Sequence, residues 1–87
     1  MLYLVDRPLA DVAFRTAADD PDARVVLIQD GVLLDPDSDA YPDLEAPTYA
    51  VAKDAAVRGV DLPDGVEPVE YDAVLDLILD HEVKSFV

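Results

Sequence analysis

Cysteine is absent from this 87-residue sequence, and its absence removes several kinds of chemistry. Without a thiol the chain cannot form disulfides, use a thiolate nucleophile, bind a metal through sulfur or carry a persulfide. The glycines Gly31, Gly59 and Gly65 are isolated, so the sequence contains no glycine-rich phosphate-binding loop. Neither serine lies in a Gly-x-Ser-x-Gly turn. The sequence therefore carries none of these catalytic motifs.

Cationic residues are scarce, with six Lys and Arg against 20 Asp and Glu, which gives a net charge of −14. Direct nucleic-acid binding is not expected, because it requires a basic stripe. Repulsion at this charge opposes a compact state in dilute buffer, whereas molar salt shortens the Debye length to about 3 Å. We interpret the acidity as the adaptation of a halophilic, salt-accumulating organism. An ordinary acidic protein is the alternative.

Long apolar runs are also missing, since none approaches the 18 residues that a membrane span needs. Asp6 interrupts the first apolar segment before it is long enough for a signal peptide. We expect a soluble, cytoplasmic protein with one domain over residues 1–87. A domain of this size buries only about 60–65% of its unfolded surface. Burial against a partner subunit would therefore add stability.

Short apolar segments alternate with helical patterns along the chain. We predict strands at residues 1–5, 24–29, 48–52, 66–70 and 83–87, helices at 9–18, 53–58 and 72–81, and a short helix or covering segment at 32–34. This alternation predicts a parallel sheet with helices on both faces and right-handed crossovers. Pro68 indicates an edge strand or a strand start, and Asp72 is the expected N-cap of the last helix.

The most informative segment is residues 24–32, where an uninterrupted aliphatic run ends in a polar turn. A run without polar alternation predicts an interior strand that is covered on both faces. Gln29, Asp30 and Gly31 follow this strand, at the sheet edge where parallel sheets bind ligands. We expect Gly31 to adopt a positive φ. These residues are candidates for an interface or a binding site, and a plain strand-to-helix turn is the alternative.

Lys53, Asp54 and Arg58 follow the third predicted strand. In a parallel sheet they would share an edge with Asp30. Lys53 is one of only two lysines in a chain that avoids cations. We include these three residues in the candidate interface or binding site, with a short solvated helix as the alternative.

Metal and cofactor sites are not expected. Residues 35–39 resemble the opening of a calcium loop, but Ala40 and Ala46 stand where such a loop needs Gly and Glu. His81 is the only histidine and lies in the last turn of a predicted helix, where a surface or capping role is expected. We predict no metal, no cofactor and no catalytic residue.

The sequence resembles the DsrH/TusB group of the DsrE/DsrF/DsrH-like sulfur-relay proteins at residues 1–3, 25–32, 49–59, 71, 74–79, 81 and 83–86. The Gln-Asp-Gly-Val turn at residues 29–32 and the segment at 49–59 carry most of this likeness. The sequence departs from the group at its end, where Phe86 and Val87 replace the usual Trp. The segment at 35–47 has no matching motif.

The resemblance implies a small flavodoxin-like α/β three-layer sandwich with a five-stranded parallel sheet. It implies a subunit that binds DsrE/TusD-like and DsrF/TusC-like proteins in a relay for 2-thiolation of the tRNA wobble uridine. In that relay the sulfur-carrying cysteine belongs to the DsrE/TusD-like partner. The matching region here, roughly residues 51–54, has no thiol. A non-catalytic subunit is therefore expected.

Two other functions remain open from the residues alone. The chain could be a stand-alone module that binds a small ligand or a protein, either as a monomer or as a homo-oligomer. It could also be an enzyme that uses Asp30, Lys53 or His81 as acid or base, although the sequence shows no mutually orienting pair.

Overall fold

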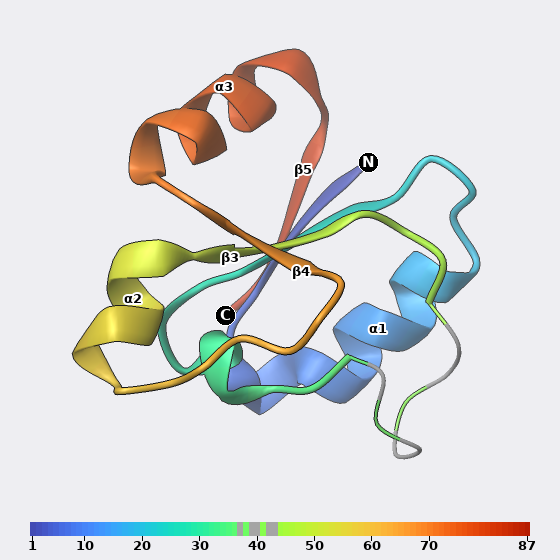
Figure 1. Cartoon of the computed structure of the whole chain (residues 1–87). Helices are drawn as coiled ribbons and strands as arrows, with labels where there is room; N and C mark the ends of the chain where they lie inside the picture. The colour runs from blue at the N-terminus through green and yellow to red at the C-terminus, as the bar shows by residue number, and fades with distance from the viewer. Residues whose placement is uncertain (37, 39–40, 42–43) are drawn as a thin grey trace.

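The computed structural model describes residues 1–36, 38, 41 and 44–87, and it has an all-parallel five-stranded sheet (Figure 1). The strands are β1 (Leu2–Val5), β2 (Arg24–Leu27), β3 (Thr48–Val51), β4 (Val66–Val69) and β5 (Val83–Phe86). The helices are η1 (Arg7–Leu9), α1 (Ala10–Ala18), η2 (Gln29–Leu33), α2 (Ala52–Val57) and α3 (Tyr71–Asp80). The predicted small α/β flavodoxin-like fold with a five-stranded parallel sheet is confirmed.

Strand β2 is interior, as its unbroken aliphatic run predicts. Val25, Val26 and Leu27 are fully buried, and β2 pairs with β1 on one side and with β3 on the other. The strand ends two residues before the predicted limit, because Gln29 already belongs to the 3-10 helix η2.

The strand order is β4-β3-β2-β1-β5. The chain moves in one direction from β1 to β4 and then crosses the whole sheet to place β5 beside β1. If every crossover has the same hand, the last connection must lie on the opposite face from the others. Helix α3 does lie opposite α1, η2 and α2 (Figure 1).

Alternation along the strands divides the core into two layers. Tyr3, Val5 and Leu27 face α1, η2 and α2, and they pack with Phe14 of α1. On the other face Leu2, Val26 and Val51 pack with Val74 of α3, with Leu77 and Ile78 partly buried beside them. Three helical segments thus cover one face, and a single helix covers the other.

The predicted N-cap of α3 is corrected. The sequence predicts Asp72 as the N-cap of α3, but the helix begins at Tyr71 and Glu70 is the cap. The Glu70 carbonyl accepts hydrogen bonds from the N–H groups of Ala73 and Val74. Asp72 lies instead in the first turn, where a carboxylate is favourable for the helix dipole.

The expected role of Pro68 is confirmed, because β4 pairs only with β3 and forms one edge of the sheet. The pattern at residues 35–46, which includes the calcium-like opening, lies partly outside the described residues.

Candidate functional site

The candidate residues gather where the carboxyl ends of β2, β3 and β4 meet the helices that follow. The connection after β3 enters α2 on one face of the sheet, and the connection after β4 enters α3 on the other face. Neighbouring strands whose connections leave toward opposite faces create a crevice between them, and open α/β sheets bind ligands in such crevices. The ends of β3 and β4 therefore form the switch point of this fold.

Asp54, in the first turn of α2, links three elements at this edge. Its Oδ2 accepts a hydrogen bond of 2.8 Å from the backbone N–H of Gln29, at the start of η2. Gln29 has a φ of 49°, a left-handed conformation that is rare for a residue with a side chain. The Asp54 carboxylate thus stabilises a strained turn directly after the central strand.

Tyr71, the first residue of α3, also binds Asp54. Its hydroxyl lies 3.1 Å from Oδ1 and 3.2 Å from Oδ2 of that carboxylate. The hydrogen bond to Asp54 raises the pKa of the Tyr71 phenol, because the carboxylate favours the protonated form. This bond crosses the switch point and joins α2 to α3.

Arg58 connects the end of α2 to the turn after β2. Its Nε donates to Oδ1 of Asp30 at 2.8 Å, and its Nη1 donates to the carbonyl of Asp54 at 3.3 Å. The hydrogen bond to Asp30 raises the pKa of the Arg58 guanidinium. Because the Asp30 side chain is 58% exposed, the ion pair contributes little to stability and mainly fixes the geometry of the turn.

Gly31 allows the close approach of η2 to β1. A Cβ at this position would lie 2.2 Å from the carbonyl oxygen of Val5, which is backbone and cannot move aside. The expected positive φ at Gly31 is wrong, since Gln29 takes that conformation instead. Glycine is needed here for space rather than for its dihedral angles.

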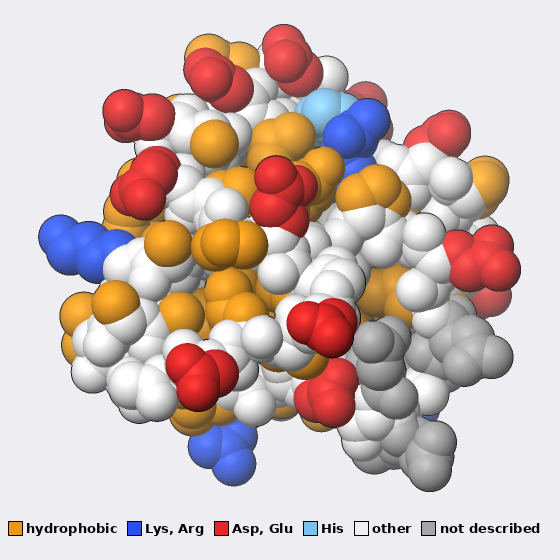
Figure 2. All heavy atoms as spheres, in the orientation of Figure 1, with side chains coloured by type: hydrophobic (Ala, Val, Ile, Leu, Met, Phe, Trp, Pro, Cys, Tyr) orange, Lys and Arg blue, Asp and Glu red, His pale blue; other side chains and the backbone are white. Residues whose placement is uncertain are grey.

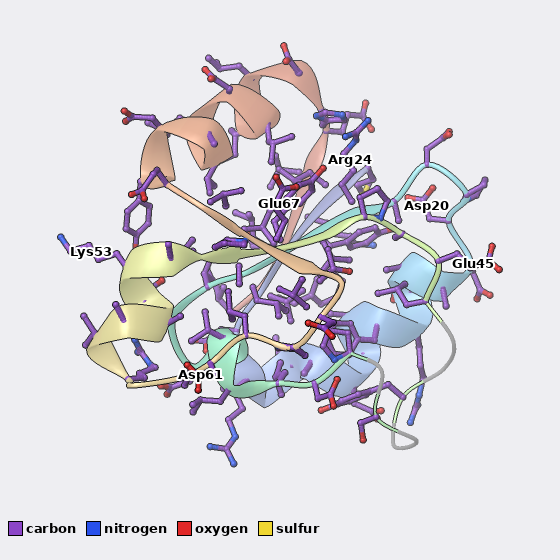
Figure 3. The ribbon with its side chains drawn as sticks, viewed as in Figure 1. Asp20, Arg24, Glu45, Lys53, Asp61 and Glu67 are labelled. Carbon is purple, nitrogen blue, oxygen red and sulfur yellow. The ribbon has the colours of Figure 1, made fainter. Side chains whose placement is uncertain are left out.

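Lys53 stands apart from these contacts. The side chain is exposed and points away from the body of the protein (Figure 3). Within the described residues no hydrogen bond or ion pair to Lys53 is present. The structure therefore joins Gln29, Asp30, Asp54 and Arg58, and it leaves Lys53 as a free cation beside them.

Sequence reasoning missed Tyr71 as a member of this group, which we call the Asp54 cluster: Gln29, Asp30, Asp54, Arg58 and Tyr71. Tyr71 lies 17 residues from Asp54 in the sequence. The available signal is a tyrosine directly before the predicted helix at 72–81, but its partner depends on β3 and β4 being neighbours.

His81 has the capping position expected of it. Its Nδ1 lies 2.9 Å from the carbonyl oxygen of Leu77, at the end of α3. Among the residues that the structure describes, no three His, Cys, Asp or Glu side chains are grouped to hold a metal ion.

The Asp54 cluster contains acids, a guanidinium and a phenol that are already paired with one another. These pairings hold the turn after β2, helix α2 and the start of α3 in fixed positions relative to one another. In the described part of the chain, no helix is both long and apolar enough to cross a membrane.

Comparison with known protein families gives a match over most of the chain. A family model described as DsrH like protein matches residues 9–84. No curated protein and no solved structure matches the chain. The matched region contains every residue of the Asp54 cluster and Lys53.

Proposed function

The chain belongs to the DsrH-like family, which has a role in sulfur relay, and from this we propose that it is a non-catalytic subunit of a sulfur-relay complex. The observation that carries the proposal is the lack of cysteine in a member of this family. Sulfur passes between proteins as a persulfide on a thiol, and a chain without a thiol must rely on a neighbour to carry it.

The proposed neighbours are a DsrE/TusD-like protein that carries the cysteine and a DsrF/TusC-like protein. The proposed acceptor pathway is 2-thiolation of the tRNA wobble uridine, in the cytoplasm. The high negative charge supports delivery of sulfur through proteins, because the chain has no basic stripe with which to hold the tRNA itself.

The Asp54 cluster and Lys53 form the proposed contact with the cysteine-bearing partner. Asp54 fixes the turn at Gln29 and the start of α3 together, so the loops at the switch point present a fixed shape. Lys53 adds an exposed cation at the same edge. A preorganised surface of this kind binds with little loss of conformational entropy.

Co-expression with the DsrE-like and DsrF-like chains of the same organism tests the proposal. We expect the three chains to purify as one complex and the purified chain alone to transfer no sulfur from a persulfide donor. The alternative, a stand-alone binding module, predicts that this chain purifies without either partner. Sulfur transfer by the isolated chain would contradict the proposal directly.

Asp54→Ala is the variant that tests the contact region. It removes the acceptor of both the Gln29 N–H and the Tyr71 hydroxyl, and it should weaken the complex while the isolated chain remains folded. The matched control is Asp61→Ala, in the exposed loop before β4, which removes the same charge away from the cluster.

A further inference from the structure

Helix α3 carries more apolar surface than its own sheet covers. Val74 is buried, and Leu77 and Ile78 are partly buried, against β1, β2 and β3. A second row at four-residue spacing, which we call the outer row, consists of Tyr71, Leu75 and Leu79. These three residues are 47%, 57% and 82% exposed.

The outer row widens the apolar face of α3 well beyond what packing on one sheet needs. At 100° per residue, the inner and outer rows together span about 200° of the helix surface, whereas a helix on a core typically shows an apolar stripe of about 100°. The additional width indicates that a second element packs beside α3.

Acidic residues border the outer row along its whole length. Asp72, Asp76 and Asp80 each follow one of the three outer-row residues, and all are exposed. Figure 2 shows several acidic side chains on the part of the surface that α3 forms. In the described residues these carboxylates form no ion pair, and α3 has no basic residue in its last turn. Like charges four residues apart destabilise a helix, and Asp near its C-terminus opposes the dipole.

We propose that the outer row of α3 is the docking surface for a partner protein whose own apolar strip is bordered by Lys or Arg. The inference rests on the proposed function, because it says which surface and which chemistry hold this chain in its complex. The apolar side chains would supply the buried contact, and cations of the partner would pair with the unpaired carboxylates.

A second copy of this chain does not fit the surface. A two-fold dimer with antiparallel outer rows would bring two identical acidic borders together, and in any arrangement each chain already carries a charge of −14. Like charges in close contact oppose association. The complementary surface must therefore come from a chain of different composition.

The outer row continues into the Asp54 cluster through Tyr71. The hydroxyl of Tyr71 binds Asp54 at the carboxyl edge of the sheet, while the side chain remains 47% exposed at the first position of the row. One partner could therefore contact the switch point and the outer row as a continuous surface.

The test measures the affinity of this chain for the co-expressed DsrE-like and DsrF-like chains. The double variant Leu75→Asp, Leu79→Asp should weaken the complex about tenfold or more. Its control is Val12→Asp, at an exposed apolar position of α1 on the opposite face of the sheet, which should bind like the unchanged protein.

A second pair of variants tests the charge requirement. Asp76→Lys, Asp80→Lys should weaken the complex about tenfold at about 0.1 M salt and less at about 1 M salt. Asp61→Lys, Asp64→Lys makes the same change in charge in the exposed loop before β4 and should leave binding unchanged.

The outcomes separate this inference from the proposed function. If the unchanged chain binds neither partner, the proposed function fails and this inference fails with it. If it binds and the outer-row variants bind equally well, the surface is wrong and the proposed function stands. Sedimentation of the chain alone should show a monomer, and a dimer that Leu75→Asp disrupts would overturn the assignment of a different chain.

Discussion

The helices on the two faces of the sheet differ in how much of their apolar surface they bury and in whether their charged side chains are paired. On one face, α1 buries Ala10, Ala13, Phe14 and Ala17, and its outward charges pair within the helix as Asp11 and Arg15, 2.6 Å apart. On the other face, α3 exposes an apolar row, and its three carboxylates find no cation among the described residues. Helix α1 exposes one large apolar side chain, Val12, beside paired charges, whereas α3 exposes three in a row beside unpaired carboxylates, so α3 has more of the properties of an interface.

The largest expected contrast comes from truncating an apolar residue on each face. Phe14→Ala removes a ring that is 1% exposed and packs edge-on against Tyr41, with 4.6 Å between the two ring centroids. The change should lower the free energy of unfolding by about 3–5 kcal/mol. Leu79→Ala, at 82% exposure, should change it by less than about 0.5 kcal/mol. Chemical denaturation of the isolated chain measures both, and a large loss in Leu79→Ala would show that α3 already uses its outer row.

The next largest effect on stability concerns the contact of η2 with β1, on the face of the sheet that α1 and α2 cover. Gly31→Ala should cost about 2–3 kcal/mol, because its Cβ meets the Val5 carbonyl at 2.2 Å. The control is Gly59→Ala, which has a φ of +64° but open space around the new Cβ, and should cost only about 1–2 kcal/mol. Thermal unfolding of the two variants gives the comparison, and the reverse order would mean that dihedral strain outweighs the steric contact.

Removing the Asp54 carboxylate, which joins helices on the two faces of the sheet, should have a smaller effect on stability. Asp54→Ala removes the bonds that join η2, α2 and α3, and it should lower the free energy of unfolding by about 1 kcal/mol. Hydrogen exchange at the Gln29 amide should become faster in the variant. Unchanged protection of that amide would argue that Asp54 does not hold the turn.

Salt should stabilise the α3 face, where the carboxylates are unpaired, more than the α1 face, where Asp11 and Arg15 are paired. We propose that the acidity of the chain is a salt adaptation, and screening the two like-charge pairs of α3 alone is worth about 0.5–1 kcal/mol. The free energy of unfolding should therefore rise between about 0.1 M and about 1 M KCl. Equal stability at both concentrations would contradict the salt adaptation.

The smallest effect is a pH dependence at the switch point. The Tyr71 pKa is raised in the folded state by its bond to Asp54, so the bond stabilises the fold below the unfolded value of 10.0 and is lost as pH rises through the folded value. Tyr71→Phe should remove this part of the alkaline loss of stability. An identical alkaline profile in the variant would show that another group causes the loss.

The sequence predicts best those elements whose own pattern decides their structure. The aliphatic run in β2 requires cover on both faces and predicts its interior position. Pro68 cannot donate to a second neighbouring strand, which limits it to an edge strand or a strand start, and the structure has the edge. Asp30 and Arg58 could be assigned to one edge because parallel strands end together, and the structure does pair them.

Other features depend on tertiary contacts that no local pattern carries. The bond between Tyr71 and Asp54 requires α2 and α3 to begin at neighbouring strands, and strand order is not encoded in periodicity. The exchange of roles between Gln29 and Gly31 arises because η2 lies against the Val5 carbonyl. The sequence position of Lys53 places it with the other candidates, but its exposed side chain does not join them.

The most direct test of the central claim is persulfide transfer measured on the isolated chain and on the chain purified with its DsrE-like and DsrF-like partners. The account predicts no sulfur on the isolated chain and, in the complex, sulfur bound only to a partner cysteine. Sulfur transferred by this chain alone would contradict it.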